Sequence, residues 1–141
     1  MAAFIDTGVF VAFSNVEDRN HVNAVELLQR ATGGEYGSVF TSDYVLDETV
    51  TLALMRTKKP ALAIEVGELI LGNPARGIQS FAKLLHVDDE TFAEAWALFK
   101  RYAGRGLSFT DCTTIALMKG EGIESLISFD RSFGGIVKIV G

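Results

Sequence analysis

Residues 107–133 read LSFTDCTTIALMKGEGIESLISFDRSF, and this stretch decides the fold class. Its first half predicts a helix over roughly residues 110–119, and its second half predicts a short apolar strand over 125–129. A helix followed by a buried strand is half of a βαβ unit, so the stretch predicts a mostly parallel sheet covered by helices on both faces. Asp111 stands at the start of this helix, and Asp130 directly follows the strand.

The rest of the chain repeats this alternation of strands and helices. There is no internal repeat, low-complexity tract or Pro/Ser-rich linker, so we expect a single α/β domain over residues 1–141. Further strands are predicted at residues 2–5, 37–41, 83–87 and 136–140, and further helices at residues 20–32, 43–58, 60–71 and 89–103.

Composition narrows the class of protein. Hydrophobic residues make up 48% of the chain and charged residues 22%, which is typical of a folded domain. No apolar stretch approaches the roughly 18 residues that suggest a membrane span, and the N-terminus lacks the basic leader of a signal peptide. The single cysteine, Cys112, excludes an internal disulfide framework and fits a cytoplasmic protein. The net charge of −5 argues against binding nucleic acid with the whole surface, but it allows a concentrated acidic metal site.

Acidic residues stand at the ends of several predicted elements. Asp6 and Asp130 each follow a strand, Asp111 begins a helix, and Asp47 or Glu48 lies in the second turn of another helix. In a parallel sheet the strand ends and the helix starts meet at one edge, where ligands bind. We therefore expect these carboxylates to converge in space.

Clustered carboxylates repel one another unless a cation compensates them. Oxygen ligands suit Mg²⁺ or Mn²⁺, and such a site can activate water for attack on a phosphodiester. Zinc fits less well, because His21, His86 and Cys112 are dispersed along the chain. The alternative interpretation is that each acid is only a cap, a turn residue or a charge that complements a helix dipole.

Three segments together resemble the PIN-domain nucleases, and especially the small VapC-type toxins of prokaryotic toxin–antitoxin pairs. They are FIDTGVFVAF at residues 4–13, SDYVLDETV at residues 42–50, and the stretch 107–133 quoted above. The resemblance covers nearly the whole chain. It implies a three-layer α/β/α fold and a ribonuclease that depends on Mg²⁺ or Mn²⁺.

The resemblance also implies roles for particular residues. The family's glutamate matches Glu48, which decides between it and Asp47, and hydroxyl positions beside the family's site match Thr7 and Ser128. The implied partners are an RNA substrate, an antitoxin protein and a second copy of the chain in a homodimer. The four acids expected to bind metal and carry catalysis are Asp6, Glu48, Asp111 and Asp130.

Arginines are the candidate substrate contacts. Arg131, next to Asp130, is the first candidate to touch a substrate phosphate, and Arg105 is a weaker one. Receiver domains, haloacid-dehalogenase phosphatases and Rossmann domains all fit poorly, because DTGVF after the first strand has one acid and no Gly-rich turn. The serious alternative is a PIN-like module that binds a protein partner and has little or no nuclease activity.

Overall fold

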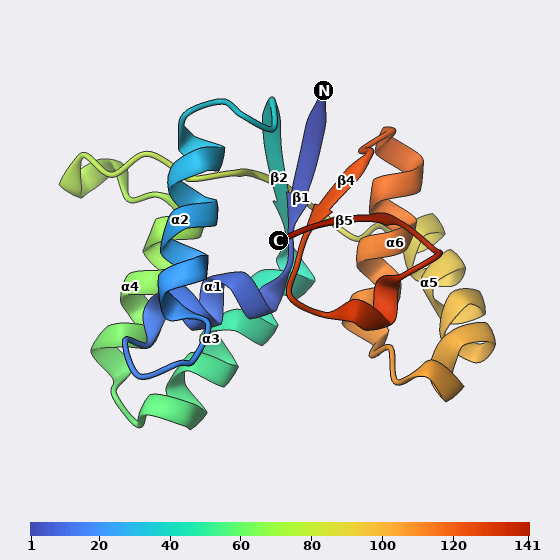
Figure 1. Ribbon diagram of the computed structural model, residues 1–141, viewed down its shortest axis with the longest axis horizontal. Helices are drawn as coiled ribbons and strands as arrows, with labels where there is room; N and C mark the ends of the chain where they lie inside the picture. Colours follow the sequence, from blue (N-terminus) through green and yellow to red (C-terminus); the bar gives the residue numbers. More distant parts are fainter.

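The computed structural model describes all residues 1–141 and is built around a five-stranded parallel sheet (Figure 1). The strand order is β3-β2-β1-β4-β5, and every neighbouring pair is parallel. The mostly parallel sheet predicted from the sequence is therefore confirmed. The strands are β1 (Ala2–Ile5), β2 (Ser38–Ser42), β3 (Lys83–Leu85), β4 (Ser125–Ile127) and β5 (Lys138–Val140).

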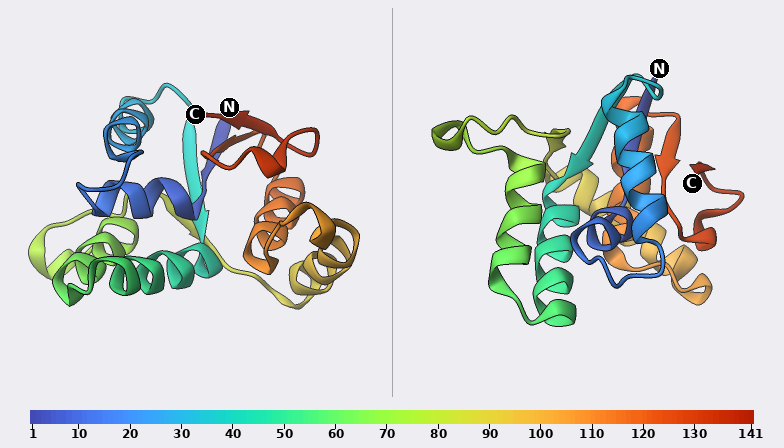
Figure 2. Two further views of the ribbon diagram at one scale, coloured as in Figure 1. Left: turned by 60° about the horizontal axis from the view of Figure 1, so that its bottom comes forward. Right: turned by 60° about the vertical axis from the view of Figure 1, so that its left-hand side comes forward.

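Six α-helices cover the two faces of the sheet. Helices α1 to α4 lie on one side and α5 and α6 on the other, which gives the three layers of an α/β/α fold (Figures 1 and 2). None of these helices is long and apolar enough to cross a membrane. The helices are α1 (Thr7–Ser14), α2 (His21–Thr32), α3 (Asp43–Thr57), α4 (Pro60–Leu71), α5 (Asp89–Tyr102) and α6 (Phe109–Glu121).

The central strand β1 fixes the position of the core. Ala3, Phe4 and Ile5 have no exposed surface, because helices cover both faces of the strand. A strand buried on both faces reads as a continuous apolar run, which is why AAFI shows no polar alternation. Further along the chain, the strand order reverses between β1 and β4. Such a reversal creates a crevice at the carboxyl ends of the strands, where open α/β sheets bind ligands.

Helix α1 is the element that the sequence pattern did not reveal. It begins at Thr7 directly after β1, with Asp6 as its N-cap, and it buries Val9, Phe10 and Val11. Its interior, residues 9–13, is wholly apolar, so no polar stripe marks a helical period. Its β-branched and aromatic residues also have low helix propensity. Burial between the sheet and the other helices therefore outweighs local preference here.

The predicted strand at 83–87 was too long at its end. Strand β3 ends at Leu85, and the Val87 amide donates to the carboxylate of Asp43, at 3.2 Å from Oδ1. A side chain from the start of α3 thus replaces the next strand hydrogen bond. This contact cannot be read from the sequence near Val87, because the two residues lie 44 positions apart.

Candidate active site

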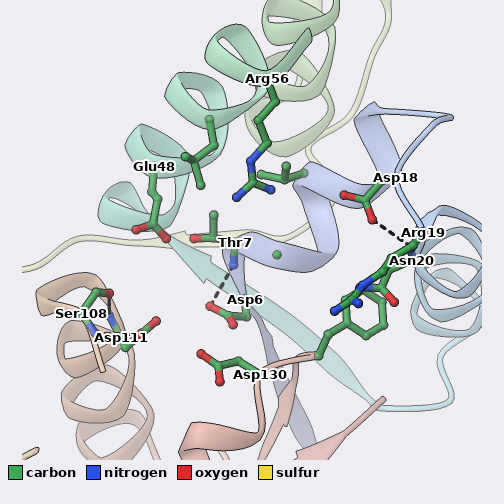
Figure 3. Close-up of a pocket in the computed structure, with 14 residues that line it drawn as sticks. Asp6, Thr7, Asp18, Arg19, Asn20, Glu48, Arg56, Ser108, Asp111 and Asp130 are labelled. Carbon is green, nitrogen blue, oxygen red and sulfur yellow. Dashed lines mark hydrogen bonds between the residues drawn. The ribbon is translucent and has the colours of Figure 1, made fainter. Parts of the chain in front are cut away.

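One cavity at the carboxyl edge of the sheet collects all four predicted acids (Figure 3). Its volume is about 410 Å³, and it lies beside the ends of β1 and β4, where the strand order reverses. The acids come from four separate segments of the chain, which only the tertiary fold brings together. The cavity is lined by Asp6, Thr7, Gly8, Val11, Asp18, Arg19, Asn20, Glu48, Leu52, Arg56, Ser108, Asp111, Phe129 and Asp130.

Asp6 is the most buried of the acids, with 5% of its surface exposed. Its Oδ1 accepts a hydrogen bond of 2.9 Å from the Thr7 amide, and its Oδ2 accepts one of 2.7 Å from the Ser128 hydroxyl. Burial raises the pKa of Asp6 from its ordinary value of 3.8 to about 7; the Ser128 hydrogen bond opposes the rise, and the charge of Asp111 adds to it. Asp6 is therefore a buried carboxylate whose charge a cation would stabilise.

Ser128 joins the two acids that follow β1 and β4. While its hydroxyl donates to Asp6, its oxygen accepts a hydrogen bond of 3.0 Å from the Asp130 amide. Asp130 in turn caps the short 3₁₀ turn Arg131–Phe133, because its Oδ1 accepts from the Ser132 amide at 2.8 Å. The predicted position of Ser128 beside the site is thus found in the structure, with a fully buried side chain.

Asp111 lies in a capping box at the start of α6. Ser108 is the N-cap, its hydroxyl accepts from the Asp111 amide at 3.1 Å, and Asp111 Oδ2 accepts from the Ser108 amide at 2.8 Å. Burial raises the pKa of Asp111, the Ser108 hydrogen bonds oppose this, and the charges of Glu48 and Asp130 add to the rise. Capping and facing the other acids are therefore compatible, because only one carboxylate oxygen is engaged by the backbone.

The structure places Glu48 and Asp47 in different environments. Glu48 is half-buried and lines the cavity, whereas Asp47 is exposed and lies outside it. Glu48 makes no hydrogen bond or salt bridge with another residue, so both of its oxygens are available to a ligand. Thr7 also lines the cavity, and its buried Oγ1 has no hydrogen-bond partner. A buried hydroxyl without a partner fits a site that binds water, an ion or a substrate oxygen.

Two arginines in the cavity were missed by the sequence analysis. Arg56 lies on α3, eight residues after Glu48. Leu52 lies midway between them, so all three residues share one face of the helix. Figure 3 shows the Arg56 guanidinium pointing toward the acids. The spacing Glu48, Leu52, Arg56 is a helical signal that would have found it. Arg19 precedes α2 in a loop, where no periodic signal exists.

The two arginines predicted to bind substrate lie outside this cavity. Arg131 is exposed and lines a neighbouring cavity. The guanidinium of Arg105 donates to the carbonyl oxygens of Ser132 and Gly134 at 2.9 and 2.6 Å. Arg105 therefore fastens the turn that follows Asp130. Between the cavities, Phe129 is half-buried and lines both, whereas Phe133 is a fully buried core residue.

The donor set suits a hydrated oxygen-binding cation. The acids do not form a ready-made cluster of three close metal ligands. Mg²⁺ keeps several of its water molecules and is usually bound directly by only one or two carboxylates. Carboxylates spread around a 410 Å³ cavity can bind such an ion partly through water. The raised pKa values of Asp6 and Asp111 also fit a site in which a bound cation would balance the negative charge of the carboxylates.

Solved structures support the same architecture. VapC20 of Mycobacterium tuberculosis, described as a sarcin-ricin loop cleaving toxin, matches with a TM-score of 0.76 at 28% identity, covering 95% of this chain and 92% of that one. VapBC2 of Rickettsia felis, bound to a DNA fragment from its promoter, matches with a TM-score of 0.66 at 15% identity, covering 99% and 98%. The second likeness is evidence for the fold alone.

Relatives are also found by sequence. A VapC ribonuclease of Archaeoglobus fulgidus is 33% identical over 134 residues, 94% of this chain and 80% of the relative. A 23S rRNA-specific endonuclease, VapC20 of Mycobacterium tuberculosis, is 30% identical over 138 residues, 96% of each chain. The model of the PIN domain family matches residues 3–138. These matches confirm the resemblance seen in the sequence: the chain belongs to the PIN domain family, among relatives of the VapC type.

Proposed function

We propose that this chain is an endoribonuclease that uses Mg²⁺ or Mn²⁺ to hydrolyse RNA phosphodiester bonds, as the toxin of a toxin–antitoxin pair. The observation that carries the proposal is the convergence of Asp6, Glu48, Asp111 and Asp130 on one cavity where the strand order reverses. The VapC names of the relatives support the ribonuclease activity. The proposal treats residues 1–141 as one catalytic domain.

The acids have different tasks in this proposal. Asp6, Asp111 and Asp130 hold the metal, directly or through water, and Ser128 keeps Asp6 and Asp130 in register by its two hydrogen bonds. A metal held by these residues would supply a water of lowered pKa for the attack and positive charge near the leaving oxygen. Glu48, which has no partner in the protein, either binds a second metal or orients the attacking water. The Thr7 hydroxyl is free to hydrogen bond to a water or a phosphate oxygen.

Arg56 supplies positive charge inside the acidic cavity. Its guanidinium forms no salt bridge or hydrogen bond with the protein, although it points toward the acids (Figure 3). A guanidinium binds phosphate oxygens with two parallel hydrogen bonds. We assign Arg56 to the phosphate at the reaction centre, because it shares a helix face with Glu48 and so keeps a fixed position relative to that acid.

Partners complete the proposal. VapBC2 of Rickettsia felis and FitAcB of Neisseria gonorrhoeae are solved structures with the same fold. We propose an antitoxin protein as the partner of this chain and a homodimer as its assembly. A protein-binding role without catalysis is the second candidate function. It is favoured by a largely apolar cavity of about 870 Å³, lined by side chains such as Phe13, Val25, Leu62 and Ile64 of α1, α2 and α4.

The deciding experiment is cleavage of structured RNAs by the purified chain. The panel contains 23S rRNA, a sarcin-ricin loop fragment and unrelated RNAs, because the similar VapC20 is described as cleaving that loop. Each RNA is incubated with Mg²⁺, Mn²⁺ or EDTA. The variants are Asp6→Asn, Glu48→Gln and, as a matched control, Asp47→Asn, which removes an exposed acid beside Glu48.

We expect cleavage with either metal, none with EDTA, and a loss of at least about a hundredfold in the Asp6 and Glu48 variants, in line with metal-assisted and acid–base catalysis. Asp47→Asn should retain the wild-type rate. Absence of cleavage across the panel, with no metal binding by calorimetry, would favour the protein-binding role. Equal losses in Asp47→Asn and Glu48→Gln would remove Glu48 from the mechanism.

A further inference from the structure

A second cavity adjoins the acidic one and has the opposite electrostatic character. Its volume is about 550 Å³, and it lies between the start of α2, the turn after Asp130 and the end of β5. Arg19, Asn20 and Phe129 line both cavities, so the two are continuous at the surface. A chain bound over the acids can therefore pass into the second cavity without leaving the protein.

Three arginines and one glutamate line this second cavity. Arg30 is engaged, because it forms a salt bridge with Glu35 and lies over the Tyr36 ring. Arg19 has no protein partner, and Arg131 makes only a long hydrogen bond of 3.4 Å to the Gly141 carbonyl. Arg19 is thus free and Arg131 only weakly engaged, so both guanidinium groups can bind a ligand, in a protein whose net charge is −5.

The position of the two free arginines is held by the fold. Arg19 immediately precedes Asn20, the N-cap residue of α2, and the Asn20 amide donates to Asp18 at 2.8 Å, which orders the turn. On the other side, Arg131 begins the turn that Asp130 caps and Arg105 fastens. Both arginines therefore project from short ordered turns rather than from long loops, which limits the entropy lost on binding.

We infer that Arg19 and Arg131 form a binding track for the RNA backbone on one side of the bond that is cut. The inference rests on the proposed ribonuclease function and adds the direction in which the strand leaves the acids. Guanidinium groups suit phosphate because they form paired hydrogen bonds and stay charged at all relevant pH values. Phe129, half-buried between the cavities, forms the wall that the strand passes.

The track is tested by binding without cleavage. Fluorescein-labelled oligouridylates of increasing length are titrated by anisotropy into the Asp6→Asn chain in EDTA, at several salt concentrations. Into this background we introduce Arg19→Gln, Arg131→Gln and both together. Arg76→Gln is the matched control, because Arg76 is also an exposed arginine but lies on the apolar cavity and pairs with Glu68.

We expect affinity to rise with oligonucleotide length and this gain to disappear in the double variant. The slope of log affinity against log salt should fall by about 0.7 for each arginine removed, the value for one phosphate contact on a single strand. Arg76→Gln should change neither quantity. Thermal unfolding of each variant confirms that the fold is retained.

Several results would overturn the track. Unchanged salt slopes and length dependence in the double variant would do so, as would binding of polyglutamate through the same arginines with equal or higher affinity. The wild-type cleavage assay is separate from this test. If the wild type cleaves RNA but the two arginine substitutions leave RNA binding unchanged, only the binding track is refuted. If RNA binding depends on the arginines but no RNA is cleaved, only the nuclease function is refuted.

Discussion

Asp6 is the residue whose pKa is shifted most strongly by the fold. Its carboxyl has a pKa of about 7 in the folded chain, against an ordinary value of 3.8, mainly because it is buried. The folded state therefore holds a proton that the unfolded state has lost between these two pH values. Metal-free stability must fall as the pH rises through this window and stay low above it. One pKa unit corresponds to about 1.4 kcal/mol, so the loss amounts to a few kcal/mol.

The first prediction follows from this fall in stability with rising pH. Asp6→Asn should raise the midpoint of thermal unfolding of the metal-free chain at pH 8, because it replaces a buried charge with a neutral group. The amide oxygen of asparagine can still accept from the Thr7 amide, and its NH₂ group can donate to the Ser128 oxygen instead of accepting from it. At pH 5 the wild-type carboxyl is protonated in the folded state but mostly ionised in the unfolded state, so the same substitution should raise the midpoint by less than at pH 8. Calorimetric scans in EDTA at both pH values measure this. Equal shifts at pH 5 and pH 8 would contradict the raised pKa.

Arg105 acts through the turn that it fastens. Arg105→Gln removes the hydrogen bonds to the Ser132 and Gly134 carbonyls, so it should loosen the segment that follows Asp130. We expect the free energy of unfolding to fall by about 1 kcal/mol and the cleavage rate to fall by about five- to tenfold. Arg105→Lys should restore part of the rate, because a single Arg105 nitrogen donates to both carbonyls and an ammonium also carries more than one donor.

The control for this second prediction is Arg101→Gln. Arg101 and Arg105 both lie over the Tyr102 ring, at 5.2 and 5.9 Å from its centre, but only Arg105 reaches the turn. Arg101→Gln should therefore keep a cleavage rate and a free energy of unfolding close to those of the wild type. Steady-state cleavage and urea unfolding measure the two quantities. A matching loss in both variants would assign the effect to the aromatic contact instead.

At the scale of the elements, the end of α3 contains a strained residue. Lys58 is the C-cap, with φ of 60°, and it is the one residue other than glycine with a positive φ. A side chain in this left-handed conformation costs about 1 kcal/mol, which glycine avoids. Lys58→Gly should therefore raise the free energy of unfolding by about 0.5–1 kcal/mol and leave cleavage unchanged, as measured by urea titration and the RNA assay.

The neighbouring residue supplies the contrast for this third prediction. Lys59 has an extended backbone, with φ of −119°, and it precedes Pro60 at the start of α4. Lys59→Gly gains nothing from relief of strain and increases the freedom of the unfolded chain. It should lower the free energy of unfolding by roughly 0.5 kcal/mol through this entropy effect. Stabilisation by both substitutions would mean that loss of positive charge, not backbone conformation, is the cause.

At the scale of the whole molecule, a metal in the acidic cavity would link four distant segments. Such an ion binds the folded chain and not the unfolded one, because the acids meet only after folding. As the fourth prediction, Mg²⁺ or Mn²⁺ should raise the midpoint of thermal unfolding at pH 8, by more as the metal concentration increases. Asp130→Asn should remove most of this rise, whereas Asp47→Asn should keep it.

The metal prediction has a clear contrary outcome. If the divalent ions raise the midpoint equally in wild type, Asp130→Asn and the double variant Asp6→Asn/Asp111→Asn, the ions act on the general negative charge. A matched titration with NaCl at equal ionic strength separates that screening effect from binding.

Local patterns account for what could be predicted from the sequence. The alternation of strands and helices and the position of each acid at the end of an element are short-range properties, so the parallel sheet and the shared edge followed from them. Helix α1 was missed because its apolar residues show no period. Patterning left Asp47 and Glu48 unresolved, and the choice of Glu48 came from the resemblance to PIN domains.

The sequence by itself thus determined the α/β class and the edge at which the acids gather, because these depend on residue type and spacing. Only the tertiary structure decided that β1 lies beside β4, so that Ser128 bridges Asp6 and Asp130. It also decided the raised pKa of Asp6 and the meeting of Arg19 with Arg131 around one cavity. The reason is that burial and contact between distant residues arise from packing, which no local window of sequence contains.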